Sequence, residues 1–254
     1  MNPELYDAHD RLEDRHWWFE GRRRVIREVL RRHLLPRAKR RLLDVGCGTG
    51  GMFPMLIEFG EVDGAEASPD ALERARRKFP GHRIEPCALP TTLPEGTWDV
   101  VTAFDVIEHL DDPIASLQAM RSRLPFDGQV VVTVPAFQFL WSHHDEVNQH
   151  RRRYSRLELV SQLSSAGLRV TFVSYYNTLL FPAVAGARLL ERLLPSRAKS
   201  EDSDLEETPG PINRALTTLF GSERLAVGRA SLPFGVSLIA VAQNGTTGAN
   251  SPRR

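Results

Sequence analysis

Residues 41–50, Arg-Leu-Leu-Asp-Val-Gly-Cys-Gly-Thr-Gly, limit more than any other segment what this chain can fold into. The apolar half, 41–45, predicts a buried strand. The other half predicts a tight turn, because glycine lets the backbone bend sharply and approach a ligand with no side chain between them. Its glycines are Gly46, Gly48 and Gly50. From Thr49 onward we expect a helix whose free backbone N–H groups point at that ligand. The segment therefore predicts the first strand, loop and helix of a nucleotide-binding α/β sheet.

Two kinds of nucleotide fit this loop. Gly46-x-Gly48-x-x-Gly51 satisfies the dinucleotide fingerprint, although that pattern alone is a weak signal. Asp44 stands two residues before the first glycine, where a carboxylate would repel a pyrophosphate and attract an amino group. The segment 43–50 resembles motif I of the class I S-adenosylmethionine (SAM) methyltransferases. We therefore favour SAM over a nicotinamide or flavin cofactor, and over an ordinary glycine turn.

The resemblance implies a Rossmann-like α/β fold, in which helices flank a seven-stranded sheet whose last strand is antiparallel. It also implies that SAM contacts the loop, namely Asp44, Gly46, Cys47, Gly48 and Gly50. We expect an N-terminal helical arm at 1–40, a SAM-binding domain at 41–176 and 236–243, a helical insertion at 177–235, and a disordered tail at 244–254.

An acidic residue ends the second expected strand, at about 62–66. This residue, Glu66, comes roughly 20 residues after Asp44, where dinucleotide-type folds hold a ribose. A carboxylate there can accept hydrogen bonds from both ribose hydroxyls, and the position matches motif II of the family. We also expect the neighbouring Ala67 beside the cofactor. The alternative for Glu66 is an exposed glutamate at the end of a strand.

The third expected strand, 83–85, leads into Pro86-Cys87-Ala88-Leu89-Pro90. Many relatives carry an acid near this cysteine that holds the adenine amine. Because the acid is absent here, we expect adenine recognition by backbone groups at Ala88 and Leu89. A Pro-Cys pair is also the nucleophile signature of cytosine C5 methyltransferases, but theirs follows the fourth strand.

The fourth expected strand, 98–104, runs into Asp-Val-Ile-Glu-His-Leu at 105–110. This form is typical of the branch of the family that acts on small molecules. The Asn/Asp-Pro-Pro-aromatic motif that base-amino methyltransferases use to grip a flipped base is missing. By this resemblance Phe104, Asp105 and His109 lie near the methionine part of SAM. His109 is either catalytic or a cap for the helix that follows.

A helical segment at 4–35 precedes the sheet and contains His-Trp-Trp-Phe-Glu-Gly-Arg-Arg-Arg at 16–24. Two adjacent tryptophans cannot both enter one core from a regular helix, so we expect one to cover a ligand. The stretch resembles the Trp-Trp and Arg elements of ubiquinone-type O-methyltransferases. The resemblance implies that this helix closes over SAM, that Arg22 or Arg23 meets the SAM carboxylate, and that Trp18 faces the acceptor. A plain surface arginine is the alternative. The arginine-rich outer face predicts a solvated surface rather than a nucleic-acid arm.

The segment 141–154 follows the fifth expected strand and starts at the carboxyl end of the sheet, where ligands bind in open α/β folds. Its side chains suited to an acceptor are Trp141, His144, His150 and Tyr154. His144, next to Asp145, is a candidate base, because a neutral histidine accepts a proton near pH 7. Tyr154 and His109 are the other catalytic candidates. A purely structural loop, and a metal ion at His143, His144 and Asp145, are the alternatives; we predict no metal.

The insertion contains apolar runs around 179–194 and 212–227, joined by an acidic linker. The first run either packs on the sheet or forms an apolar entrance for a lipid-like or aromatic acceptor, in contact with a membrane surface. It is too short to cross a bilayer, which takes about 20 residues.

Net charge and cysteine content narrow the function further. The net charge of +1 argues against a dedicated polyanion binder and predicts no DNA partner. Cys47 and Cys87 have no zinc or disulfide spacing, and the N-terminus is polar and acidic, so we expect a cytoplasmic protein without a signal peptide. We predict a SAM-dependent methyltransferase that O-methylates a small-molecule acceptor. The alternatives are an RNA methyltransferase and a SAM-binding module without turnover.

Overall fold

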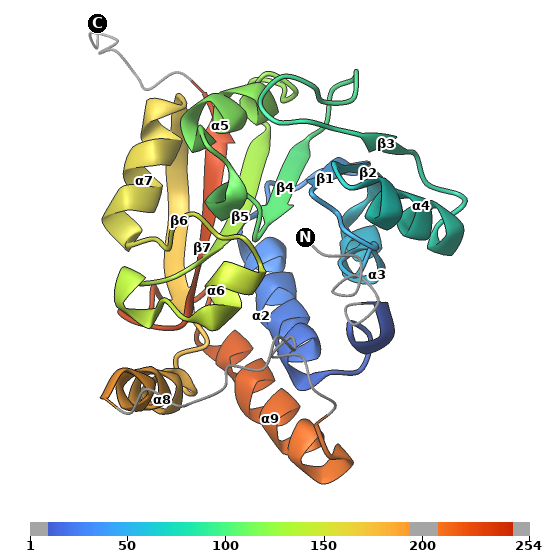
Figure 1. Ribbon diagram of the computed structural model, residues 1–254. Helices are drawn as coiled ribbons and strands as arrows, with labels where there is room; N and C mark the ends of the chain where they lie inside the picture. Colours follow the sequence, from blue (N-terminus) through green and yellow to red (C-terminus); the bar gives the residue numbers. More distant parts are fainter. Residues whose placement is uncertain (1–9, 194–207, 246–254) are drawn as a thin grey trace, which may run out of the picture.

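The computed structural model describes residues 10–193 and 208–245. Its strands are β1 (Arg41–Val45), β2 (Glu61–Glu66), β3 (Ile84–Pro86), β4 (Val100–Phe104), β5 (Gln129–Pro135), β6 (Leu168–Tyr176) and β7 (Ser237–Asn244). They form one seven-stranded sheet in the order β3-β2-β1-β4-β5-β7-β6 (Figure 1). The pairs among β1 to β5 are parallel, whereas β7 runs antiparallel to both β5 and β6. The predicted fold class, including the antiparallel last strand, is confirmed.

Helices cover both faces of this sheet (Figure 1). They are α2 (Trp17–His33), α3 (Phe53–Leu56), α4 (Pro69–Lys78), α5 (Pro113–Arg121), α6 (His143–Val147), α7 (Arg156–Ser165), α8 (Phe181–Leu193) and α9 (Gly210–Ser222), with short 3-10 turns η1 (Ile57–Phe59), η2 (Ile107–His109), η3 (Gln138–Leu140) and η4 (Glu223–Leu225). Alternate side chains of β1 enter two separate cores. Leu43 joins the core beneath α5 and α7, and Leu42 joins the core beneath α2, α3 and α4.

The strand order reverses between β1 and β4. From β1 the sheet continues through β2 to β3, and from β4 it continues through β5 to β7. Because chains leave β1 and β4 toward opposite sides, a crevice opens beyond their carboxyl ends, and ligands of such folds bind there. The glycine loop that follows Val45 and the turn that follows Phe104 border this crevice.

The helix predicted from Thr49 begins later and is short. α3 has four residues and starts at Phe53. Gly50 has φ +91°, outside the range of a right-handed helix, so regular helix cannot form until after it. Loop backbone rather than a long helix N-terminus therefore borders the crevice. The prediction that the disordered tail starts at Asn244 is wrong for that residue, since Asn244 closes β7 and its N–H donates to the carbonyl of Gly128 at 2.7 Å.

The insertion packs mainly on the N-terminal helix. The N–H of Trp17 donates to Oδ1 of Asn213 on α9 at 2.7 Å, and Phe220 lies buried against Gly21 of α2. On α8, Leu189 and Leu190 are exposed, whereas Leu180, just before α8, packs against the core beneath α2, α3 and α4. Packing on the sheet therefore accounts for only part of this apolar run. Whether the arm and the insertion are separate units stays a prediction, as does contact with a membrane surface. Within 10–193 and 208–245, no helix combines the length and the apolar character that crossing a bilayer requires.

Three predictions concern residues that the structure does not describe. The start of the helical segment at 4–35 falls on residues 1–9, and the acidic linker falls on 194–207. Most of the predicted tail falls on 246–254, which are also outside the described residues.

Candidate functional site

A cavity of about 420 Å³ lies at the carboxyl ends of β1 and β4. This volume is in the range of small-molecule sites. The glycine loop, η2, the first turns of α2, the segment from α6 to Arg153, and α8 all contribute to its wall. The predicted site residues among its lining are Trp18, Arg22, Asp44, Gly46, Cys47, Gly48, Phe104, Asp105, His109, His144 and His150. The fold thus brings most of the predicted residues to one place.

The glycine loop presents bare backbone to this cavity. Gly46 and Gly48 have φ +68° and +57°, a left-handed conformation that favours glycine. A Cβ added at Gly48 would meet no atom within 4 Å, so the space beside this glycine is empty. A side chain at this position would fill that space. At Gly46 and Gly50 a Cβ would instead lie 2.5 Å from a neighbouring side chain, that of Val106 and that of Phe79 respectively. Gly46 and Gly48 line the cavity, whereas Gly50 allows close packing behind it.

The carboxylate of Glu66 holds the glycine loop in place by a hydrogen bond. Its Oε2 accepts a hydrogen bond from the N–H of Gly48, and its Oε1 accepts one from the N–H of Ser68, both at 2.8 Å. Glu66 is buried, and it does not belong to the cavity lining described above. Each carboxylate oxygen keeps a second lone pair, so these contacts leave the predicted ribose role open. The sequence did not reveal the contact with Gly48.

Asp44 is buried at the end of β1 and lines the cavity. Its Oδ1 accepts a hydrogen bond from Oγ1 of Thr102 at 2.6 Å. Burial raises the pKa of Asp44 to about 7. A cationic group of a ligand beside it would stabilise the ionised form, which suits the predicted contact with an amino group.

The N-terminal helix is fastened to the sheet by an ion pair. Arg22 is buried, and its guanidinium contacts Oδ2 of Asp105 at 2.6 Å and Oγ1 of Thr133 at 3.0 Å. Asp105 has φ +57°, rare for a residue other than glycine, and its N–H donates to the carbonyl of Thr133 at 3.0 Å. Arg23 also lines the cavity and donates to the carbonyl of Glu13 at 2.5 Å. Contact of either arginine with the SAM carboxylate stays a prediction.

Both tryptophans of α2 border the cavity. The guanidinium of Arg22 lies 5.1 Å from the ring centre of Trp18, and the ring of Trp17 lies 6.3 Å from that of Phe220. The sequence predicted that one of the pair would cover a ligand, and the structure brings both to the wall.

The candidate base His144 is next to Asp145 in the sequence, but the two side chains are not hydrogen-bonded to each other in the structure. The histidine that bonds to Asp145 is His150, whose Nδ1 lies 2.8 Å from Oδ1. Adjacent residues of helix α6 point in directions about 100° apart, so His144 turns away from its neighbour and contacts the side chain of Asn148. Arg153 donates to both oxygens of Asp145, at 2.8 and 2.9 Å. Burial alone would raise the pKa of Asp145, but the hydrogen bonds from His150 and Arg153 outweigh it and hold that pKa below its ordinary value.

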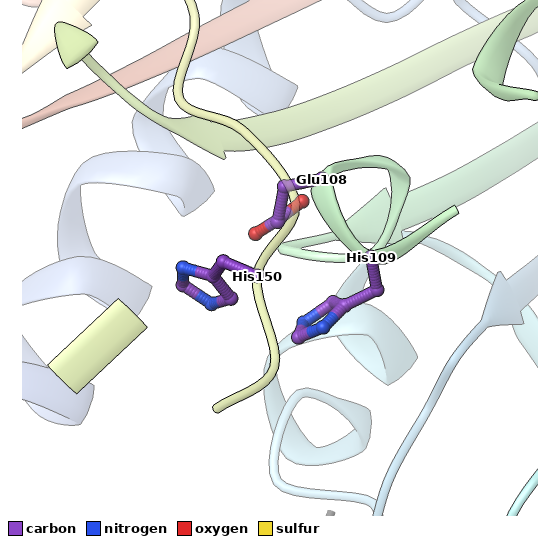
Figure 2. A group of neighbouring side chains, drawn as sticks. All are labelled: Glu108, His109 and His150. Atoms are coloured by element: carbon purple, nitrogen blue, oxygen red, sulfur yellow. The ribbon is translucent and has the colours of Figure 1, made fainter. Parts of the chain in front are cut away.

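Three titratable side chains lie together on the cavity wall, as Figure 2 shows. They are Glu108 and His109 from η2 and His150 from the segment after α6. The two imidazole rings are 4.8 Å apart and nearly perpendicular. Burial raises the pKa of Glu108 well above its ordinary value, and burial together with the nearby His150 lowers the pKa of His109 to about 4. The sequence did not single out Glu108, because its burial depends on segments far away in the chain.

Two residues predicted to face the acceptor lie elsewhere. Tyr154 is only 1% exposed and belongs to the core beneath α5 and α7, where its hydroxyl donates to the carbonyl of Ile107 at 3.4 Å. Its backbone pairs with Pro135 and Phe137 beside β5, and this draws the side chain inward. Burial raises the pKa of the Tyr154 phenol. Trp141 is half-buried and is not among the described residues that line the cavity.

The predicted adenine contacts also lie outside the cavity lining. Ala67 and Ala88 are exposed after β2 and β3, and Leu89 is half-buried next to Ala88. Their contact with the cofactor stays a prediction.

The methyltransferase domain family matches residues 17–173, more than half of the chain and nearly every segment that builds the cavity. The chain belongs to this family. The cofactor of such a methyltransferase is SAM, which agrees with the side-chain-free space at Gly48 and the buried acid at Asp44.

Curated methyltransferases resemble this one over part of their length. The ubiquinone biosynthesis O-methyltransferase of Albidiferax ferrireducens is 32% identical over 134 residues, which cover 47% of this chain and 53% of that protein. The tRNA U34 carboxymethyltransferase of Shewanella denitrificans is 34% identical over 112 residues, covering 41% of this chain and 34% of that protein. This chain therefore spans about half or less of the length of these relatives.

A solved structure supports the fold over nearly the whole chain. A chain in the complex between the Haloferax volcanii Trm112 methyltransferase activator and a methyltransferase superposes with a TM-score of 0.62. The match covers 97% of both chains at 17% identity. At that identity the likeness establishes the class I methyltransferase architecture and nothing about the acceptor.

Proposed function

We propose that this methyltransferase transfers a methyl group from SAM to a hydroxyl of a small-molecule acceptor, as a member of the ubiquinone-methyltransferase-like branch. One observation carries the proposal: the glycine loop and the histidines His109, His144 and His150 line the same cavity. We assign the loop to the cofactor end of the cavity and the histidines to the acceptor end. A donor and an acceptor can meet in such a space under the cover of α2.

The residues at the cofactor end suit the parts of SAM. The backbone at Gly46 and Gly48 lets the cofactor come close, and the carboxylate of Glu66 can accept hydrogen bonds from its ribose. Asp44 can pair with the amino group, and Arg22 or Arg23 with the carboxylate. When bound, SAM supplies a methyl group already activated on a sulfonium.

The acceptor end must orient a hydroxyl, exclude water and take away a proton. Trp17 and Trp18 border the cavity and can exclude water from it. His144 also lines it, and we assign to its imidazole the role of proton acceptor. The relative from Albidiferax ferrireducens, whose name gives an O-methyltransferase, supports transfer to oxygen.

The test is release of S-adenosylhomocysteine when the full-length protein is incubated with SAM and an extract of small metabolites. Turnover is expected with the parent. His144→Ala should lower kcat at least tenfold, because general-base catalysis contributes roughly 10²–10⁴-fold. Its affinity for SAM should stay within about threefold of the parent, which is roughly 0.6 kcal/mol. His143→Ala, a change in a neighbouring histidine that does not line the cavity, is the matched control.

Each contrary result has a definite meaning. Tight binding of SAM without product from any extract would favour a SAM-binding module without turnover. Parent-like turnover by His144→Ala would remove the base assignment. Product formed with tRNA but not with small metabolites would contradict the small-molecule acceptor and agree with the tRNA-directed relative.

A further inference from the structure

We propose that Glu108, His109 and His150 bind a divalent transition-metal ion on the wall of the cavity. Binding of the ion does not depend on the methyl transfer proposed above. Its role, which is to orient and polarise an acceptor oxygen, rests on the function proposed above.

The geometry suits three ligands to one ion. One ligand atom from each side chain lies within 4.8 Å of the other two. Ligand atoms bound at about 2.0–2.2 Å from zinc are roughly 3–3.5 Å apart, so side-chain movements on the order of 1 Å would bring them into coordination. Glu108 and His109 are neighbours in η2, and His150 approaches from a distant part of the chain (Figure 2).

The buried carboxylate of Glu108 points independently to a cation. Glu108 is 0% exposed, and neither of its oxygens has a hydrogen-bond partner among the residues that the structure describes. A buried carboxylate without a partner is strongly unfavourable unless it is protonated or faces a cation. The guanidinium groups of Arg22 and Arg153 are nearby, but they are paired with Asp105 and Asp145.

Both histidines are held as metal ligands are usually held. Nδ1 of His150 bonds to the carboxylate of Asp145, and His109 bonds to the backbone carbonyl of Gln149. Metal-bound histidines almost always donate their second ring N–H to a carboxylate or carbonyl in this way, which fixes the ring and exposes the other nitrogen. The same contacts make the alternative site at His143, His144 and Asp145 unsuitable, because Arg153 already bonds to both oxygens of Asp145.

The donor set selects the class of ion. Two imidazoles and one carboxylate suit zinc, iron(II), manganese or cobalt, whereas magnesium and calcium prefer ligands that are all oxygen. Three protein ligands leave further coordination positions for an acceptor oxygen or water. This proposal replaces the sequence-based prediction of no metal.

Direct titration tests the site without any turnover. The full-length protein is treated with a chelator and dialysed. It is then titrated with Zn²⁺ by calorimetry and with Co²⁺ by visible absorption. About one ion per chain is expected. Glu108→Gln and His150→Ala should each weaken binding at least tenfold, since even outer partners of a metal site contribute about 10–100-fold. His143→Ala should bind like the parent. Melting temperatures report whether each variant is folded.

The outcomes separate this proposal from the proposed function. No stoichiometric binding by the parent, or parent-like binding by both ligand variants, would overturn the metal site. If a variant does not fold, anomalous diffraction from the zinc-bound parent locates the ion, and an ion away from Glu108 is equally decisive. A parallel titration with SAM distinguishes failure of the metal site from failure of the proposed function. Absence of metal binding by the parent with intact SAM binding overturns the site alone, whereas metal binding by the parent with no methyl transfer overturns only the function.

Discussion

Asp44 has a buried carboxyl whose ionisation depends on what faces it. Burial raises its pKa to about 7 in the folded protein, above the ordinary value of an unfolded aspartate. Below about pH 7 the protonated form is therefore favoured in the free protein. Because the unfolded chain ionises near the ordinary pKa of about 4, this carboxyl destabilises the fold increasingly from about pH 4 to pH 7, and the destabilisation is constant above that range. A bound amino group reverses this preference, because it stabilises the carboxylate.

We predict that affinity for SAM rises between about pH 6 and pH 7.5, by roughly eightfold if only the ionised Asp44 binds. Calorimetric titration across this range measures the change. Asp44→Asn should bind more weakly and lose most of the pH dependence, since an amide does not ionise here. A pH profile that persists unchanged in Asp44→Asn would assign it to another group.

Glu66 acts on the cofactor site in two ways. Its carboxylate holds the N–H of Gly48 and is also the candidate acceptor for the ribose hydroxyls. We expect Glu66→Gln to weaken SAM binding by about 1.5–3 kcal/mol, the usual contribution of a hydrogen bond to a charged group. Glu61→Gln, an exposed change at the other end of β2, is the matched control. An affinity of Glu66→Gln equal to that of the control would contradict the ribose assignment.

At the scale of elements, α2, whose first turns line the cavity, forms a close helix pair with α9. Phe220 of α9 is fully buried, and a Cβ added at Gly21 of α2 would lie 2.5 Å from its ring. Gly21 is thus needed where α2 crosses α9 because the ring of Phe220 leaves no room for a side chain, and not because of its backbone conformation. The approach allows Trp17 to bond to Asn213 at the end of the same interface.

Two helical glycines should respond oppositely to alanine. Alanine is ordinarily preferred over glycine inside a helix by about 1 kcal/mol. Gly186→Ala on α8, where a Cβ meets nothing within 4 Å, should therefore stabilise the protein by up to that amount. Gly21→Ala should instead destabilise it by about 1–3 kcal/mol, the range for overpacking a core. Denaturant unfolding of both variants measures the difference, and a stabilised Gly21→Ala would mean that α9 moves away easily.

At the scale of the whole molecule, acidic side chains nearly balance the basic ones, and on α2 ion pairs neutralise several arginines. On the outer face of α2, Arg24 pairs with Glu20, Arg27 with Glu58 at 2.9 Å, and Arg32 with Glu28 at 2.6 Å. These pairs agree with the predicted solvated face, and the net charge of the chain is only +1. We therefore expect only weak electrostatic attraction between this protein and a polyanion.

We therefore predict no tRNA binding stronger than the non-specific range of about 10⁻⁴–10⁻⁶ M at physiological salt. Fluorescence anisotropy with total tRNA, repeated at low and high salt, measures this. Tight binding whose affinity falls steeply with added salt would revive RNA as the acceptor.

Local patterns were sufficient to predict the sheet and its cofactor loop. The decisive residues are Gly46 and Gly48, Asp44 before them, and Glu66 at the end of the next strand. They act through backbone conformation and strand position, which neighbouring residues determine. The antiparallel last strand came from the family resemblance rather than from the pattern of its residues. The helix expected from Thr49 was wrong because one left-handed glycine delays it.

Only the tertiary structure decided which side chains of the distant segments meet. Tyr154 looked like a residue of the acceptor site, but pairing of its backbone beside β5 turns it into the core. His150 rather than His144 bonds to Asp145, and Glu108 became notable because packing buried it without a hydrogen-bond partner. Glu108 and His150 are about 40 residues apart in the chain, and they meet only because whole helices and strands pack together. Residue type and spacing alone do not predict which side chains such packing buries or pairs.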